Sequence, residues 1–206
     1  MPQPKQKIDM LAFERKLQES GNKLISGTDE VGRGPLAGPV CVATVIMPLD
    51  NIIEGVNDSK KLSPQKRDKL YDKIMATAKY VRVEMVNEKI IDQINILQAT
   101  KLAMAKSIEN LGVMPDIALI DAVKNLDVKC PQMPIIKGDA QSYSIAAASI
   151  VAKVTRDRLM KELAQKYLQY DLENNMGYGT AKHIEALKKF GPCEIHRKTF
   201  LKFLQK

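Results

Sequence analysis

The sequence predicts one α/β domain that continues into a helical C-terminal part. Short β-branched runs alternate with stretches of helical period over the first two thirds of the 206 residues, and the last third is helical. No repeat, low-complexity tract or linker divides the chain into independent units. We therefore expect an N-terminal helical segment over 1–22, a core over 23–170 and a helical extension packed on that core over 171–206.

The first half of the core is predicted to alternate between helices and strands. The expected elements are a helix over 8–19, strands over 23–28 and 40–47, a helix over 64–78 and a strand over 80–86. The strand over 40–47 follows a Gly/Pro-rich turn, so it is expected to form a hairpin with the strand before it. Ser63 is a favourable N-cap in front of Pro64, which marks the start of the following helix.

The second half is predicted to contain two short strands and then mainly helices. The expected elements are a helix over 95–111, strands over 117–120 and 134–136, and helices over 143–167, 180–190 and about 197–204. Gly112 supplies a stop for the first of these helices, and glycines separate the last ones.

The composition favours a polyanionic partner. The 32 basic and 24 acidic side chains give a net charge of +8, although a basic cytosolic enzyme without a nucleic-acid role fits the charge equally well. Aromatic residues make up 5% of the chain and Trp is absent, which disfavours a base-stacking platform for single strands. The three cysteines form neither a disulfide pattern nor a zinc motif, and the N-terminus lacks a signal-like apolar stretch. A cytoplasmic location is therefore expected.

Four carboxylates lie at or just after the ends of the predicted short strands, namely Asp29, Glu30, Asp121 and Asp139. Clustered carboxylates are the ligands that hard divalent cations need for phosphoryl transfer. Acidic residues at such positions also serve as N-caps and turn residues, and spacing alone leaves both readings open. Adjacent residues of a regular strand point to opposite faces, so Asp29 and Glu30 can share a site only at a strand end or a bulge.

The glycine-rich turn after the acidic pair has two possible functions. The segment 32–37 matches the loose dinucleotide pattern G-x-G-x-x-G/A, but a strand is expected after it where that pattern needs a helix. A glycine-flanked arginine can instead bring backbone amides close to a phosphate or a ribose. The only histidines, His183 and His196, are expected to be solvated or capping residues, and Cys41 a core residue.

The segment from Gly27 to Val40, GTDEVGRGPLAGPV, closely resembles the signature of the prokaryotic ribonuclease HII family. Six further blocks resemble the family's motifs in the same order: DSKKL at 58–62, IDA at 120–122, KGD at 137–139, AAASIVAKVTRD at 146–157, GYGT at 177–180 with His183, and GP at 191–192 with His196-Arg197. The resemblance covers nearly the whole chain after about residue 24.

The resemblance implies a ribonuclease H-like mixed sheet flanked by helices, and an endonuclease that cuts RNA in RNA–DNA hybrids and at ribonucleotides embedded in duplex DNA. It implies that Asp29, Glu30, Asp121 and Asp139 are catalytic and bind two Mg²⁺ or Mn²⁺ ions. Those ions would activate an in-line water and neutralise the leaving 3′-oxygen, so the products end in 3′-hydroxyl and 5′-phosphate. Roles in ribonucleotide excision repair and DNA replication follow from this activity.

The same resemblance implies a substrate-binding set. The segment Gly32-Arg33-Gly34 matches the one that reads the ribose 2′-hydroxyl, and Tyr178 matches a tyrosine that stacks under the adjacent deoxyribose. Lys60 is expected to contact a phosphate. Asp157 is left outside the site, because ion pairs along its helix explain it equally well.

Two rival functions stay open at this level: a catalytically idle nucleic-acid-binding protein of the same fold, and a dinucleotide-dependent enzyme that uses the Gly32 turn. A replication clamp is a further candidate partner, through the apolar C-terminal residues Phe200, Leu201, Phe203 and Leu204. Packing of those side chains on the core is the simpler interpretation.

Overall fold

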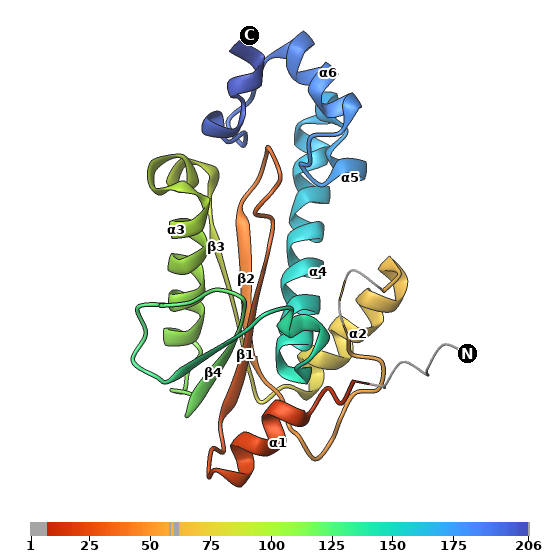
Figure 1. The fold of residues 1–206 in the computed structure, drawn as a ribbon. Coiled ribbons are helices and arrows are strands. Elements are labelled where there is room, and N and C mark those ends of the chain that lie inside the picture. Colours follow the sequence, from red (N-terminus) through yellow and green to blue (C-terminus); the bar gives the residue numbers. More distant parts are fainter. Residues whose placement is uncertain (1–7, 58, 60–61, 206) are drawn as a thin grey trace, which may run out of the picture.

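A five-stranded mixed β-sheet forms the centre of the molecule in the computed structural model, which describes residues 8–57, 59 and 62–205 (Figure 1). Its strands are β1 (Ile25–Val31), β2 (Val40–Ile46), β3 (Tyr80–Val86), β4 (Ile117–Asp121) and β5 (Gln132–Ile135), in the order β3-β2-β1-β4-β5. Strands β1, β2 and β3 pair antiparallel, whereas β4 is parallel to both β1 and β5. The predicted mixed sheet is confirmed.

Helices cover both faces of this sheet. Figure 1 shows α3 (Glu88–Glu109) on one face and α4 (Tyr143–Lys166) with α2 (Pro64–Thr77) on the other. Side chains of β2 alternate between the two resulting cores: Val40 and Val42 face α3, while Cys41 and Ala43 face α4. Because both faces are covered, β2 is buried along its whole length, and its sequence is apolar except for Thr44.

The long helix α4 lies directly against β1. A Cβ atom on Gly27 would lie 2.1 Å from the backbone carbon of Ser144, a distance that no side chain tolerates. The glycine therefore permits the close approach of helix and strand. This approach brings the side of α4 next to Asp29 of β1.

The N-terminal helix α1 (Ala12–Glu19) anchors the start of α4. The buried Glu14 carboxylate accepts hydrogen bonds from the Ser142 hydroxyl at 2.6 Å and from the Ser144 amide at 2.9 Å. Two otherwise unpaired groups at the first turn of α4 are satisfied in this way. The segment 8–22 therefore has a packing role.

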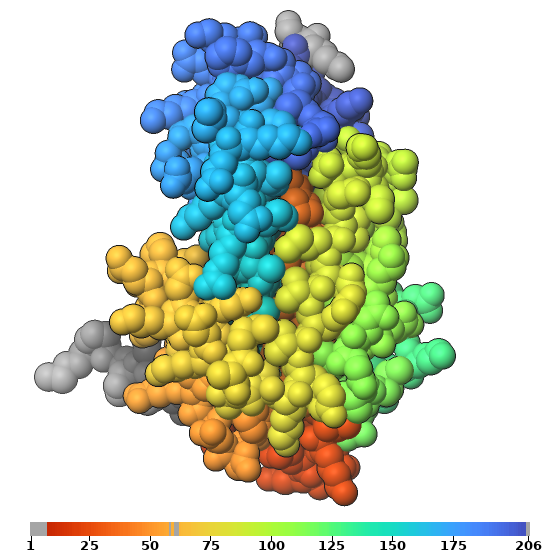
Figure 2. Space-filling view, turned by 180° about the vertical axis from the view of Figure 1, so that it is seen from behind, coloured from red at the N-terminus to blue at the C-terminus, as the bar shows by residue number. Residues whose placement is uncertain are grey.

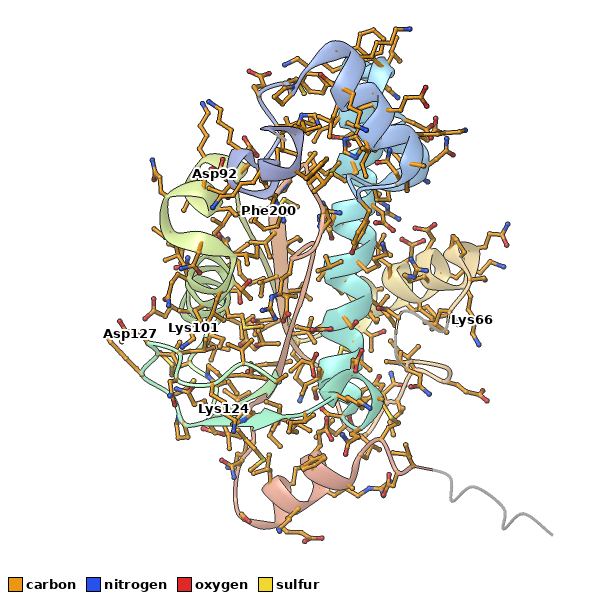
Figure 3. All side chains as sticks on the ribbon, turned by 45° about the horizontal axis from the view of Figure 1, so that its top comes forward. Lys66, Asp92, Lys101, Lys124, Asp127 and Phe200 are labelled. Atoms are coloured by element: carbon orange, nitrogen blue, oxygen red, sulfur yellow. The ribbon has the colours of Figure 1, made fainter. Side chains whose placement is uncertain are left out.

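The C-terminal segments gather at one end of the molecule, opposite α1, as Figures 1 and 2 show. They comprise η3 (Leu168–Tyr170), α5 (Leu172–Asn175), α6 (Ala181–Phe190), η4 (Lys198–Phe200) and η5 (Lys202–Gln205). The predicted helix over 197–204 is wrong, because the chain forms two 3₁₀ turns there. Asp92 of α3 accepts the amides of Lys198 and Thr199, and Figure 3 shows Asp92 and Phe200 where these turns meet α3.

Other predicted boundaries also differ from the structure: α1 begins at Ala12 rather than at residue 8, and β5 is Gln132–Ile135 rather than 134–136. Strand β1 continues through Val31, so Asp29 and Glu30 lie inside the strand rather than after it. Helix α3 begins at Glu88, because the Asn87 side chain accepts a hydrogen bond from the amide of Ile90. A break at Asn95, with φ 65°, separates this first part of α3 from the part that follows, which corresponds to the helix predicted over 95–111.

The expectation for Cys41 is confirmed. All three cysteines are free, and Cys41 is buried in the core. Within residues 8–57, 59 and 62–205, no helix is long and apolar enough to cross a membrane.

Candidate active site

Three carboxylates from separate elements converge at one edge of the α4-facing side of the sheet. Asp29 comes from the middle of β1, Asp121 ends β4, and Asp139 lies in the 3₁₀ turn η2 (Gly138–Ala140). Parallel pairing aligns Thr28 with Ile120, so the next residues, Asp29 and Asp121, are neighbours on adjacent strands. One carboxylate oxygen from each acidic residue lies within 4.8 Å of the other two. The grouping predicted for these three residues is thus present.

The turn after β5 delivers Asp139 to this cluster. Strand β5 pairs with β4 so that Ile135 is opposite Asp121, and the chain then turns through Lys137 at φ 55°. The amide of Gly138 donates a hydrogen bond to Asp121 Oδ1 at 2.7 Å. A Cβ on Gly138 would lie 2.6 Å from Ile145 Cδ1, so the Ile145 side chain of α4 would have to shift to admit a larger residue in the turn.

The electrostatics of Asp29 indicate a site for a cation. Its side chain is 4% exposed, and burial raises its pKa well above the usual value, with further contributions from Glu30 and Asp121. Hydrogen bonds from the Ser149 hydroxyl and the Glu30 amide oppose this shift only in part. Three crowded carboxylate oxygens form a hard oxygen donor set, which fits Mg²⁺ or Mn²⁺. The residues present therefore suit the divalent ions that the resemblance implies.

Glu30 lies on the other face of β1. It pairs with Val42, which faces α3, whereas Asp29 pairs with Ala43, which faces α4. The regular strand contains neither the end nor the bulge needed to bring both acids to one face. Glu30 Oε1 instead forms an ion pair with Arg33 Nη1 at 3.2 Å. The other carboxylate oxygen of Glu30, Oε2, is buried with no hydrogen-bond partner among the described residues. Burial raises the pKa of Glu30, while Arg33 lowers it.

The turn Gly32-Arg33-Gly34 follows β1 and is supported from beneath by a buried arginine. Arg197 donates hydrogen bonds to the carbonyls of Gly32 at 2.6 Å, Arg33 at 2.9 Å and Gly38 at 2.8 Å. Gly32 has φ +89°. The fully buried Arg197 therefore holds the turn through its carbonyl oxygens.

A second buried arginine supports the rest of this loop. Arg156 donates to the carbonyls of Pro39 at 2.9 Å and Ala37 at 3.1 Å. A Cβ on Gly32 would lie only 2.3 Å from Arg156 Nε, so the guanidinium also packs directly beneath that glycine. The two arginines together define the course of the chain between β1 and β2.

Tyr178 lies beside this turn, although it is more than 140 residues away in sequence. Its Cε1 atom is 3.6 Å from the position of a Cβ on Gly34, and its side chain is 42% exposed. The Gly177 carbonyl accepts the Leu36 amide at 2.7 Å, which ties the two segments together. The predicted partners Gly34 and Tyr178 therefore share one surface. Lys60 lies outside the described residues.

The other sequence interpretations have mixed outcomes. The turn over 32–37 leads into β2, so the helix that a dinucleotide site needs is absent. Asp157 forms the ion pair with Lys153, at 2.8 Å, that its helical spacing indicated, and a second ion pair, which was not predicted, with Arg67 of α2 at 3.5 Å. The expectation of solvated histidines is wrong, because His183 and His196 are 0% and 2% exposed. They face each other in the C-terminal part.

Sequence reasoning missed the groups that support the site. Ser149 hydrogen-bonds to Asp29 and lies 2.8 Å from the Ser59 hydroxyl, while Arg156 and Arg197 hold the loop after β1. No periodicity or spacing identifies such residues, since serine is common in helices and arginine is usually exposed. Their presence within the blocks 146–157 and 196–197 was the one available signal.

Comparison with known proteins points in one direction. The family model described as Ribonuclease HII matches residues 26–203. Ribonuclease HII of Caldicellulosiruptor bescii is 55% identical over 190 residues, which cover 92% of each chain. Ribonuclease HII of Acetivibrio thermocellus is 53% identical over 195 residues, 95% of this chain and 76% of that protein.

Solved structures agree with these relatives. Ribonuclease H2 from Pyrococcus horikoshii superposes with a TM-score of 0.75 at 27% identity, covering 89% of this chain and 100% of that one. Ribonuclease HII in the PCNA complex from Archaeoglobus fulgidus gives a TM-score of 0.77 at 27% identity, covering 89% and 97%. A ribonuclease HIII determined with Mn²⁺ has the same fold, with a TM-score of 0.66 at 20% identity and coverage of 89% and 65%.

Proposed function

Because this chain belongs to the ribonuclease HII family and is a ribonuclease H enzyme, we propose that it hydrolyses RNA in RNA–DNA hybrids and nicks duplex DNA at embedded ribonucleotides. The observation that carries this proposal is the cluster of Asp29, Asp121 and Asp139, with one oxygen of each within 4.8 Å of the others. Carboxylates repel the negatively charged phosphodiester. A cluster of them therefore serves its hydrolysis by holding divalent cations.

Asp29, Asp121 and Asp139 are the proposed catalytic metal ligands, and Glu30 is the fourth catalytic carboxylate. The buried, unpartnered Oε2 of Glu30 supports this role, as does the mutual electrostatic effect of Glu30 and Asp121. When bound, two Mg²⁺ or Mn²⁺ ions supply a more acidic water and positive charge beside the scissile phosphate.

The carboxylates orient the reacting groups for in-line displacement. A water oxygen bonds to phosphorus while the P–O3′ bond breaks, and the departing oxygen takes a proton. The products end in 5′-phosphate and 3′-hydroxyl.

The turn after β1 is proposed to read the ribose. In a planar trans peptide the carbonyl and the following N–H point in opposite directions. The carbonyls of Gly32 and Arg33 point to buried Arg197, so the amides of Arg33 and Gly34 point away from it. Such amides can donate to a 2′-hydroxyl, the group that distinguishes RNA from DNA. Tyr178 lies against the same turn and offers its ring for stacking on the adjacent deoxyribose.

The proposed substrates are polyanions, and the net charge of +8 favours their binding. Lys60 is proposed to contact a phosphate. Roles in ribonucleotide excision repair and DNA replication, and a cytoplasmic location, belong to the same proposal. A replication clamp is proposed as a partner, since the solved relative from A. fulgidus is in a PCNA complex. Phe203 is 40% exposed and available for such a contact, whereas Leu201 is buried.

The proposal is tested with a DNA duplex that contains one ribonucleotide. We expect a nick at that nucleotide in Mg²⁺ or Mn²⁺, none in EDTA, and none in an all-DNA duplex. End analysis should give 3′-hydroxyl and 5′-phosphate. Binding of the duplex without a nick in any divalent ion would instead favour the idle nucleic-acid-binding protein.

A further inference from the structure

The two buried histidines form a hydrogen-bonded pair that ends at Tyr178. His183 Nε2 lies 3.0 Å from His196 Nε2, and His183 Nδ1 lies 2.9 Å from the Tyr178 carbonyl oxygen. At the other end, the Cys193 amide donates to His196 Nδ1 at 3.0 Å. All four ring nitrogens therefore have partners within one continuous chain of hydrogen bonds.

The two ends of this chain determine the tautomer of each ring. The Cys193 amide can only donate, so His196 Nδ1 is unprotonated and the proton is on Nε2. The Tyr178 carbonyl can only accept, so His183 carries its proton on Nδ1 and accepts at Nε2. The two assignments, made independently, agree that His196 Nε2 donates to His183 Nε2.

The pair must be neutral to make these contacts. A second proton on His183 would lie on Nε2 and face the N–H of His196 at 3.0 Å. A second proton on His196 would lie on Nδ1 and face the Cys193 N–H at 3.0 Å. Burial lowers the pKa of His183, and burial together with His183 lowers the pKa of His196 to about 4. The groups facing the pair are the Tyr170 ring edge, the Cys193 thiol 3.2 Å from His196 Nδ1, and Asp171, which acts on His183. The neutral form is therefore present at neutral pH.

Hydrogen bonds hold the Tyr178 backbone through both its amide and its carbonyl. Its amide donates to the Asn175 carbonyl at 2.8 Å, and its carbonyl accepts from the Thr180 amide as well as from His183. The side chain itself is 42% exposed. Because the ring is partly exposed beside Gly34, its direction depends in part on the peptide that bears it.

The segment that contains His196 also supports the Gly32-Arg33-Gly34 turn, which is proposed to bind the ribose together with Tyr178. His196 is bridged to Ala37, and the next residue, Arg197, donates to the carbonyls of Gly32 and Arg33. His196 thus contacts Tyr178 through His183, and the adjacent Arg197 contacts the glycine-rich turn directly. This places the tyrosine and the turn in a fixed mutual arrangement.

We propose that His183 and His196 are positioning residues, which set the orientation of Tyr178 for stacking on the sugar beside the cleaved ribonucleotide. The inference rests on the proposed function, in which Tyr178 contacts the substrate. The histidines touch neither the substrate nor the carboxylates. Their loss should therefore reduce cleavage at a ribonucleotide and leave divalent-ion binding unchanged.

Amide side chains provide a matched test at each position. The amide nitrogen of Asn occupies the place of Nδ1 in histidine, and that of Gln the place of Nε2. His183→Asn keeps a donor for the Tyr178 carbonyl, whereas His183→Gln does not. At His196 the order reverses, because His196→Gln keeps the donor to His183 and His196→Asn does not. All four variants are uncharged at a buried position.

The measurements are kcat/KM on a duplex with one ribonucleotide, Mn²⁺ affinity by calorimetry and the melting temperature. We expect His183→Gln to lose about tenfold to a hundredfold in kcat/KM, the range for small misplacements of a binding group, and His183→Asn to stay within about threefold of wild type. At His196 we expect the loss in His196→Asn, and His196→Gln should stay within about threefold of wild type. Mn²⁺ affinity should be unchanged throughout.

Equal losses in the Asn and Gln variants, or wild-type cleavage by His183→Gln, would overturn the inference. If His183→Gln does not fold, the His196 pair decides by the same comparison. Tyr178→Ala separates this inference from the proposed function. Wild-type cleavage by Tyr178→Ala would remove the proposed role of the tyrosine together with this inference. Loss in Tyr178→Ala with wild-type cleavage by His183→Gln would remove only the positioning role.

Discussion

Replacing Asp29 by Asn should make the metal-free protein more stable and nearly abolish cleavage. Asp29 is 4% exposed, and Asp121 and Asp139 each have a carboxylate oxygen within 4.8 Å of one of its own. Without a cation, the folded protein must either keep these charges together or take up a proton. Asn has nearly the same shape as Asp and no charge, so it removes this cost together with a metal ligand.

The size of the effect follows from the distances. Two unit charges 4.8 Å apart repel by about 3 kcal/mol at an effective dielectric constant of ~20. Uptake of a proton relieves part of this repulsion, so we expect a gain of ~1–3 kcal/mol in the free energy of unfolding at neutral pH. For a chain of this length, that corresponds to a rise of about 2–12 °C in melting temperature.

The pH dependence has a defined sign. Burial, Glu30 and Asp121 raise the pKa of Asp29 in the folded state, so the destabilising contribution is absent below the unfolded-state pKa. It grows as the pH rises through the higher folded-state value. The difference in melting temperature between Asp29→Asn and wild type should therefore increase from acid to neutral pH.

The assay is thermal unfolding in EDTA over that pH range, with cleavage measured separately in Mg²⁺. Asp157→Asn is the control for stability, because Asp157 is ion-paired with Lys153 and Arg67, and its neutralisation should lower the melting temperature or leave it unchanged. A melting temperature of Asp29→Asn below wild type at neutral pH would refute the electrostatic reasoning. Cleavage by that variant at the wild-type rate would refute the role of Asp29.

Four further predictions concern the substrate surface. Tyr178→Ala should lose far more cleavage at a single ribonucleotide than Mn²⁺ affinity, and Tyr178→Phe should keep most activity; equal losses of cleavage and affinity in Tyr178→Ala would contradict stacking. Gly32→Ala should cost about 2 kcal/mol or more in urea unfolding, because φ is +89° and Arg156 Nε lies 2.3 Å from the added Cβ. The added Cβ of Gly34→Ala meets only an ordinary contact at 3.6 Å, so its free energy of unfolding should stay within about 0.5 kcal/mol of wild type. The variant should still nick poorly, and nicking at the wild-type rate would show that no ribose docks at Gly34. Substrate affinity measured in Ca²⁺ should fall as salt rises, with a slope of about −0.9 per phosphate contacted, and a flat dependence would remove the argument from the +8 charge.

Local signals were enough to predict most elements of the fold. Strand β3 has the predicted bounds, and α2 begins at Pro64, because alternation and the Ser63 cap depend only on neighbouring residues. The start of α3 was missed, since the Asn95 break divides its pattern. Strand β1 was predicted too short, because a buried Asp29 and Glu30 resemble a solvated turn unless the neighbouring strands are known.

The site could be predicted in its residue types and only partly in its arrangement. Asp29 and Asp121 meet through the parallel pairing of β1 with β4, a contact between residues about 90 positions apart that no local pattern encodes. Glu30 lies on the opposite face, as strand geometry requires. Arg156, Arg197 and the histidine pair are buried polar groups, whose role depends on backbone carbonyls from distant segments. Charge and spacing cannot indicate such contacts.

The central claim is that Asp29, Asp121 and Asp139 hold the divalent ions at which a ribonucleotide is cleaved. The most direct measurement is a Mn²⁺ titration of wild type and Asp121→Asn by calorimetry, with nicking of a one-ribonucleotide duplex followed in the same samples. We predict that Asp121→Asn stays folded, loses most Mn²⁺ affinity and loses nicking by orders of magnitude. Nicking by Asp121→Asn at the wild-type rate, or unchanged Mn²⁺ affinity in that variant, would contradict the account.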